Sequence, residues 1–154
     1  MKANSGVSFV LTKLIDVNNQ RVLLYKSLVD RSRDMELKIL FMQYAIQAQS
    51  FMATLNKWGL TYGADIHPKR HFFDNVQKML KGLFSSGGRN MHLNQCESME
   101  KKALKLYKTV VAMSFLPHAT IAEVNRQADE LEKASRSLKS VITGEAASWQ
   151  VAFS

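Results

Sequence analysis

Residues 90–113 read NMHLNQCESMEKKALKLYKTVVAM, and this stretch decides the fold. Its apolar residues recur at intervals of three and four, which is the spacing of one packed face of an α-helix in a bundle. The other positions are mostly polar or charged, so the opposite face should meet solvent. Glu97 and Glu100 lie beside the apolar face rather than opposite it. The apolar positions are Cys96, Met99, Ala103, Leu106, Val110 and Met113.

Three further stretches carry the same helical periodicity, at about residues 7–29, 34–58 and 117–142. The first and second helices are joined by a short turn, and so are the third and fourth. A long connection joins the second helix to the third, and it contains a shorter amphipathic piece at residues 72–84. The sequence therefore predicts an all-α fold: an antiparallel four-helix bundle of two helical hairpins, with a short extra helix in the crossover.

Glycine and proline mark the expected helix ends. Gly59 follows Trp58 and should end the second helix in a left-handed conformation. Pro117 breaks the chain before the fourth helix. That helix starts either at Pro117 itself or at a capping box formed by Thr120 and Glu123.

The composition fits one domain over residues 1–154, with a core from 7 to 142 and a tail from 143 to 154. The single cysteine, Cys96, leaves no intrachain disulfide or multi-cysteine zinc site, and its seam position predicts a small buried hydrophobe. No segment approaches the roughly 20 apolar residues of a membrane span, and the first residues do not read as a secretory signal. We therefore expect a cytoplasmic protein.

The net charge of +8 gives the chain a general attraction to polyanions. Basic residues gather on the outward face of the third helix and continue on the fourth. A solvated surface is the simpler interpretation, and nucleic-acid binding is the alternative, although no groove-reading motif or stacking aromatics accompany the charge. This basic face consists of Lys101, Lys105, Lys108, Lys133, Arg136 and Lys139.

Polar side chains fall near the centre of the expected bundle. Asn18 and Arg21 lie in the middle of the first helix's apolar stripe, where an unpaired charge would be costly. Arg21 therefore needs a carboxylate, and Glu100 or Glu132 can supply it. We expect a polar layer that fixes how the helices align, with a binding pocket as the alternative. The predicted cluster is Asn18, Arg21, Gln47, Glu100, Glu132 and Ser135.

A di-metal site of the ferritin type needs a Glu from each of two helices and a Glu-x-x-His from each of the other two. The weak metal candidates here are Glu97, Glu100 and Glu132, but the histidines are missing and Ser135 stands where one would follow Glu132. Arg21 would also repel a cation. We expect no metal site and no cofactor, with iron, manganese or zinc on these glutamates as the alternative.

No residue pattern points to catalysis. The chain contains no Gly-rich phosphate loop, nucleophile elbow or paired-carboxylate signature, so we expect no catalytic residue. His67 and His71 have ligand-like spacing, but Pro68 stands between them and no further ligand follows. His92 and His118 lie near helix ends, where solvated or capping roles are expected.

Two apolar groups have no place on the four helical seams. The first lies on the back of the second helix, and either the helix at 72–84 or another subunit should cover it. The second alternates as in a strand near the end of the chain, and it should pack on its own bundle or on a neighbour. The candidate interface residues are Ile39, Met42 and Ile46, and Trp149, Val151 and Phe153.

Two runs of the sequence carry a resemblance to a known family. They are Cys96-Glu97-x-x-Glu100-x-x-Ala103-x-x-x-Tyr107 and Asn18-Asn19-x-Arg21-x-x-x-Tyr25. With the expected crossover helix, they resemble an uncharacterised bacterial ferritin-like family, a domain of unknown function, over about residues 7–142. The resemblance implies a ferritin-like four-helix bundle in the bacterial cytoplasm and a link to stress, and it implies no activity.

The chain departs from the pattern of that family at two places that bear on metal binding. Leu23-Leu24-Tyr25 stands where the family often has a Glu before a Gly-Tyr pair. Ser135 stands where the family often has a histidine. Both departures argue further against a metal site.

We expect a non-catalytic helical-bundle protein that acts by associating with itself or with another protein. One alternative is a ferritin-like metal-binding protein or oxidoreductase that uses Glu97, Glu100 and Glu132. Another is a polyanion-binding protein that uses the basic face, and a third is small-molecule binding between the helices. The most discriminating observation is whether an ion, a water pocket or a salt bridge occupies the centre of the bundle.

Overall fold

The computed structural model describes residues 2–63 and 88–144 of the chain. They form α1 (Lys2–Arg31), α2 (Met35–Thr61), α4 (Arg89–Val111) and α5 (His118–Ile142). The described part contains no strand, which confirms the all-α class, and none of its helices combines the length and apolar character of a membrane span. The helix expected at 72–84 and the tail residues Trp149, Val151 and Phe153 lie outside the described residues.

The ends of α2 follow from local sequence. Asp34 caps the start, because its side chain accepts a hydrogen bond from the backbone N–H of Glu36 at 2.9 Å. The prediction that Gly59 ends this helix is wrong. Gly59 is buried inside α2, and helical hydrogen bonding continues until the N–H of Tyr62 reaches the Trp58 carbonyl. The left-handed glycine is Gly63, with φ 72°.

The start of α5 decides between the two predicted beginnings. Pro117 is the residue before the first turn, and the N–H of Ile121 donates to its carbonyl at 2.9 Å. The capping box is wrong, because the Thr120 hydroxyl is buried inside the helix without a hydrogen-bond partner. α1 begins at Lys2, earlier than the predicted residue 7, since no proline interrupts this first stretch.

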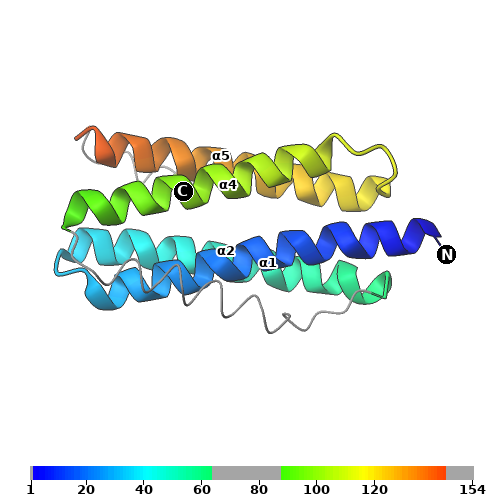
Figure 1. Ribbon diagram of the computed structural model, residues 1–154, viewed down its shortest axis with the longest axis horizontal. Helices are drawn as coiled ribbons and strands as arrows, with labels where there is room; N and C mark the ends of the chain where they lie inside the picture. Colours follow the sequence, from blue (N-terminus) through cyan, green and yellow to red (C-terminus); the bar gives the residue numbers. More distant parts are fainter. Residues whose placement is uncertain (1, 64–87, 145–154) are drawn as a thin grey trace.

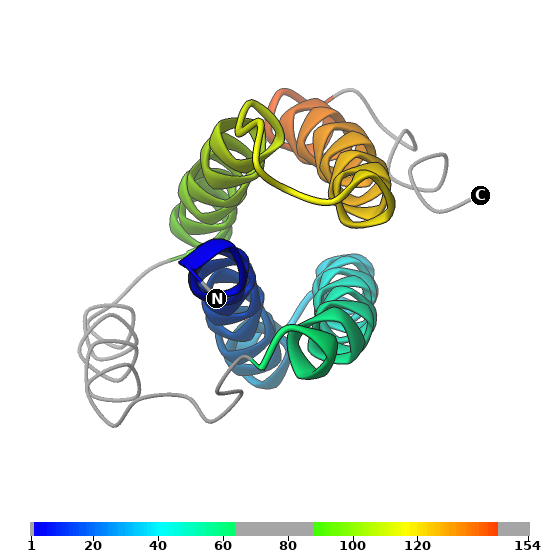
Figure 2. The ribbon, with the colours of Figure 1, turned by 90° about the vertical axis from the view of Figure 1, so that its right-hand side faces the viewer.

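The four described helices are arranged as two hairpins. A turn at residues 32–34 brings α2 back alongside α1, and α5 returns alongside α4 in the same way (Figure 1). Seen end-on, α1 lies between α2 and α4, whereas α5 lies diagonally across from α1 (Figure 2). The most extensive contacts are within each hairpin, followed by those between α1 and α4, and the contacts between α2 and α5 are sparse.

Two apolar clusters form the core, one in each half of the bundle. Along α1 the first cluster ends at Val17 and the second begins at Leu24. Along α4 the second cluster ends at Met99 and the first resumes at Ala103. The residues between the two clusters form a buried polar layer across the middle of the bundle. It contains Asn18, Arg21, Gln47 and Glu100.

Candidate functional site

The polar layer is built around a buried ion pair between Arg21 on α1 and Glu100 on α4. Nε of Arg21 donates to Oε2 of Glu100 at 3.1 Å, and Nη2 donates to Oε1 at 2.9 Å. This two-point contact matches the planar guanidinium to the carboxylate. Both side chains are fully buried, so salt in the solvent screens their attraction only weakly.

Amide and aromatic side chains surround the rest of the guanidinium. Nη1 of Arg21 donates to Oδ1 of Asn18 at 3.0 Å, and Nη2 donates to Oε1 of Gln47 at 2.7 Å. The guanidinium carbon lies 5.8 Å from the ring centres of both Tyr25 and Phe51, within the range of cation–π attraction. Arg21 is thereby held to side chains of α1, α2 and α4.

The Glu100 side chain receives a third donor. The Tyr25 hydroxyl donates to Oε1 of Glu100 at 2.5 Å. Burial alone would lower the pKa of Arg21, but the charge of Glu100 and its hydrogen bonds outweigh burial and raise that pKa. Burial, followed by the charge of Glu100, raises the pKa of Tyr25 well above its ordinary value of 10.0. The layer therefore holds a charged guanidinium beside a neutral phenol.

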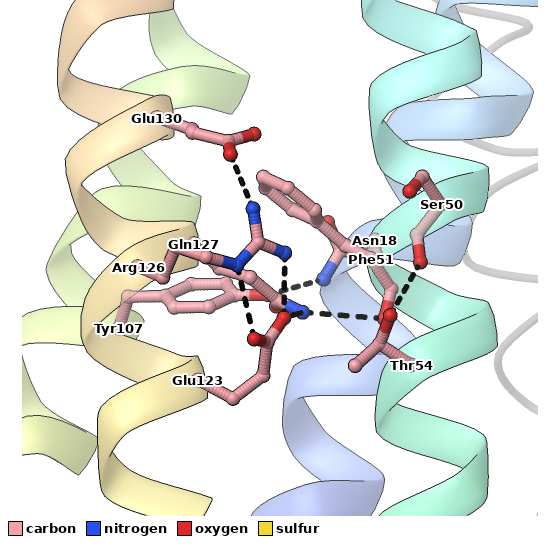
Figure 3. A network of polar contacts seen from close by, with 9 residues as sticks. All are labelled: Asn18, Ser50, Phe51, Thr54, Tyr107, Glu123, Arg126, Gln127 and Glu130. Atoms are coloured by element: carbon pink, nitrogen blue, oxygen red, sulfur yellow. Dashed lines mark hydrogen bonds and ion pairs between the residues drawn. The ribbon is translucent and has the colours of Figure 1, made fainter.

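A chain of hydrogen bonds leads from this layer toward solvent, and its outer part is drawn in Figure 3. Nδ2 of Asn18 donates to the Tyr107 hydroxyl at 2.7 Å, and that hydroxyl donates to Oε1 of Gln127 at 2.6 Å. Nε2 of Gln127 then donates to Oε1 of Glu123 at 3.0 Å. Every donor points away from Arg21, so the bonds polarise one another in one direction.

The outer end of the chain is an ion-pair cluster on α5. Arg126 lies between Glu123 and Glu130 and contacts both (Figure 3), with Nη2 2.6 Å from Oε1 of Glu123. The hydrogen bond from Arg126 lowers the pKa of Glu123, and the same contact raises the pKa of Arg126. An exposed pair contributes only about 0–1 kcal/mol by itself. Its role here is to hold Glu123 in place as the last acceptor of the buried chain.

Four residues of the predicted cluster come together: Asn18, Arg21, Gln47 and Glu100. Of the two predicted carboxylate partners, Arg21 pairs with Glu100. The reason is geometric, because α4 is adjacent to α1 whereas α5 lies across the bundle (Figure 2). On α5, Glu132 is only half-buried, and Ser135 is buried without bonding to Arg21.

Four buried polar side chains were not identified from the sequence as hydrogen-bonding members of the centre: Tyr25, Tyr44, Tyr107 and Gln127. Tyr44 on α2 donates to the Ala134 carbonyl on α5 at 2.8 Å, which bridges the most weakly packed side of the bundle. A signal for them exists in the sequence, since a buried tyrosine hydroxyl must find a partner. Tyr25, Tyr44 and Tyr107 all stand at core positions of their helices.

The network holds its side chains in place, and none of those side chains is poised to react. Asn18 and Gln127 are amides, which do not relay a proton at neutral pH, so the chain is not a proton path. Cys96 is fully buried next to the layer, and burial, followed by the charge of Glu100, raises the pKa of its thiol well above 9.0. A thiol in that state is a poor nucleophile. The arrangement can fix the four helices relative to one another.

The weak metal candidates do not converge on one point. Glu100 is bonded to Arg21, and Glu97 instead pairs with Lys101 at 3.0 Å on the helix surface. Glu132 belongs to α5. Over residues 2–63 and 88–144, no group of three or more His, Cys, Asp or Glu side chains could hold a metal ion.

The surface carries the two features that the sequence indicated. All six residues of the basic face are exposed: Lys101, Lys105, Lys108, Lys133, Arg136 and Lys139. On α2, Ile39, Met42 and Ile46 are 40%, 53% and 60% exposed, and Met35 extends the same line. We call Met35, Ile39, Met42 and Ile46 the α2 apolar row.

Searches of protein-family models and of curated proteins find no match for this chain.

Proposed function

We propose that this protein is a non-catalytic helical bundle that works by associating with a second copy of itself through the α2 apolar row. The observation that carries the proposal is this row of large apolar side chains on the outer face of a well-packed helix. The buried network supports the non-catalytic part, because its charged and polar groups are occupied by one another.

The spacing of the row favours a helical partner. Its members follow one another at intervals of four, three and four residues, which is the pattern of a two-helix coiled-coil seam. One copy of α2 can insert such side chains between those of another copy. A twofold axis through the row would make the contact self-complementary and closed.

The charge distribution favours a second copy as that partner. The chain carries a net charge of +8, so two copies repel each other across most of their surfaces. No charged residue occurs between Lys38 and Lys57 on α2. Two copies can therefore meet along this stretch of α2 without placing like charges together, and the stretch offers no cation to a polyanion.

The size of the row sets the expected strength. A standard stable interface buries about 800 Å² on each partner, and four side chains along one helix fall below that. We expect a reversible dimer with a dissociation constant roughly in the micromolar range.

Sedimentation equilibrium over a range of protein concentrations tests the proposal. The wild-type chain should shift from monomer to dimer as its concentration rises. The I46E/M42E variant should stay monomeric, because it places four carboxylates in the shared seam of a dimer. The control for a general effect of added negative charge is A122E, which adds a carboxylate at an exposed position of α5 and should dimerise like the wild type.

Two results would contradict the proposal. One is a wild-type chain that stays monomeric at several hundred micromolar, roughly a hundredfold above the expected constant. The other is dimerisation that I46E/M42E and A122E change equally. Circular dichroism of each variant keeps loss of folding separate from loss of association.

We also propose that the bundle is of the ferritin-like antiparallel type and that the protein is located in the bacterial cytoplasm. The two adjacent hairpins support the first of these statements. Stoichiometric iron, manganese or zinc in the purified protein would overturn the non-catalytic reading. A steep salt dependence of duplex binding, lost when basic-face residues are neutralised, would favour polyanion binding instead.

A further inference from the structure

We propose that a cavity at one end of the bundle binds the phosphate group of a small phosphorylated molecule. The cavity lies where the turn between α1 and α2 meets the start of α4, and its volume is about 290 Å³. Its lining brings together three arginines and a histidine from two distant parts of the sequence: Arg31, Arg33, Arg89 and His92. This site is separate from the α2 apolar row and from the buried network.

The charges around the cavity do not cancel. Asp34 is the one acidic side chain among the described lining residues. Arg31 already has a partner of its own, so the balance is between Asp34 and the guanidinium groups of Arg33 and Arg89. Nε of Arg89 lies 3.7 Å from Oδ2 of Asp34, and the two side chains are 51% and 42% exposed. A pair that long and that exposed is weak, so it leaves the cavity with a surplus of positive charge. Guanidinium groups are the side chains best matched to phosphate oxygens.

Two neighbouring groups add to this picture. The pKa of His92 is lowered, first by burial and then by the charge of Arg31, so its imidazole already feels the positive charge of the cavity. The Ser32 hydroxyl is buried in the lining, and its hydrogen bond to the Asp34 carbonyl is long, at 3.4 Å. That hydroxyl can turn to donate to an anion.

The start of α4 faces the same region. Gly88 occupies the capping position of α4 and provides no side-chain hydrogen bond to the first turn. The N–H groups of a helix start carry partial positive charge and suit an anion. This contribution reinforces the arginines and would not define a site without them.

The size and charge of the cavity select its ligand. Small-molecule sites usually measure roughly 300–1,000 Å³, so this cavity suits a compact ligand. A phosphate monoester carries about two negative charges near neutral pH, so it matches Arg33 and Arg89 together better than a single carboxylate does. The same group can arrive on a free metabolite or on a lipid headgroup, and the experiment separates the two.

Calorimetric titration at fixed ionic strength tests the site with glycerol 3-phosphate and inorganic phosphate. The R33Q/R89Q variant should bind both ligands more weakly by about tenfold or more, because two charge-assisted contacts are lost. The control is R136Q, which removes one positive charge from an exposed position of α5 and should leave binding within about twofold.

A third variant is expected to change binding in the opposite direction. D34N removes the competing carboxylate while keeping a good helix-capping side chain, so it should tighten phosphate binding several-fold. The wild-type imidazole resonance of His92 should also move as phosphate is added, and it should not move in R33Q/R89Q.

A separate experiment tests whether the phosphate belongs to a lipid headgroup. In it, vesicles containing phosphatidic acid replace the soluble ligand. Capture by these vesicles that is lost in R33Q/R89Q but kept in R136Q would assign the phosphate to a lipid. Saturable binding of the soluble ligands with the same variant pattern would assign it to a metabolite. If neither the soluble ligands nor the vesicles bind, or if R136Q weakens binding as much as R33Q/R89Q, the proposal is wrong. Unfolding midpoints of the variants show whether each remains folded.

Discussion

Arg21 is the residue on which the centre of this protein depends. Its side chain is fully buried, yet four hydrogen bonds and two aromatic rings surround the guanidinium. Removing an ion from water costs several kcal/mol, and the pair with Glu100 offsets that cost only while both partners are present. At the scale of a residue, Arg21 and Glu100 are therefore compatible with the folded state only together.

Replacing Arg21 with methionine should lower the free energy of unfolding by about 3 kcal/mol, since it leaves Glu100 buried without its counterion. Urea denaturation followed by circular dichroism measures this change. An unfolding midpoint equal to that of the wild type would show that the Glu100 side chain has found other partners or reaches water.

The double variant R21M/E100M is the control for that prediction. It removes both charges and fills the space with apolar atoms, so its stability should lie near the wild type or above it. A double variant as unstable as R21M alone would mean that lost packing, and not a stranded charge, causes the effect.

At the scale of the helices, the Tyr107 hydroxyl connects three elements of the bundle. It stands on α4, accepts from Asn18 on α1 and donates to Gln127 on α5. Since α1 and α5 lie diagonally across the bundle (Figure 2), this hydroxyl links two helices that do not lie side by side.

The Tyr107→Phe substitution should therefore destabilise the bundle by about 1–3 kcal/mol, the cost of leaving buried polar groups unpaired. Thermal or urea unfolding provides the measurement. The matched control is Tyr62→Phe at the end of α2, outside the network, which should change stability by less than about 0.5 kcal/mol. Equal losses of stability at the two positions would show that the hydrogen bonds of the network do not cause the effect.

At the scale of the whole molecule, three buried tyrosines couple folding to alkaline pH. Burial, as the largest cause, raises the pKa of Tyr25, Tyr44 and Tyr107 above the ordinary value of 10.0. In the unfolded chain the same phenols ionise near that ordinary value. A folded-state pKa that is raised gives stability that is complete below pH 10 and lost as the pH rises further.

We expect the free energy of unfolding to fall above about pH 10, by up to about 1.4 kcal/mol per pH unit for each of these tyrosines. Urea denaturation at a series of alkaline pH values measures the slope. Tyr44→Phe should make the slope shallower, because it removes one of the phenols whose pKa is raised in the folded state. A stability that stays constant through this range would show that the phenols reach solvent.

The sequence predicted the fold well because the four apolar stripes are long and regular, and it predicted the burial of Asn18 and Arg21 because they interrupt one of those stripes. It could not show whether Glu100 or Glu132 pairs with Arg21. Both glutamates flank the apolar stripes of their helices, and only the order of the helices around the bundle determines which one lies near Arg21. It missed Tyr107 and Gln127 because periodicity treats a tyrosine as apolar and does not show where its hydroxyl points. The prediction that Gly59 ends the second helix was wrong because a glycine permits a helix end without requiring one.

The buried ion pair also has a consequence for biosynthesis. Glu100 comes 79 residues after Arg21 in the chain. At translation rates of about 5–20 residues per second, the first hairpin leaves the ribosome several seconds before its counterion is made. During that interval the first hairpin cannot exclude water from the Arg21 guanidinium, because its counterion is missing. This half of the chain must therefore stay loosely packed and accessible to chaperones and proteases. Emergence of α4 ends this exposure.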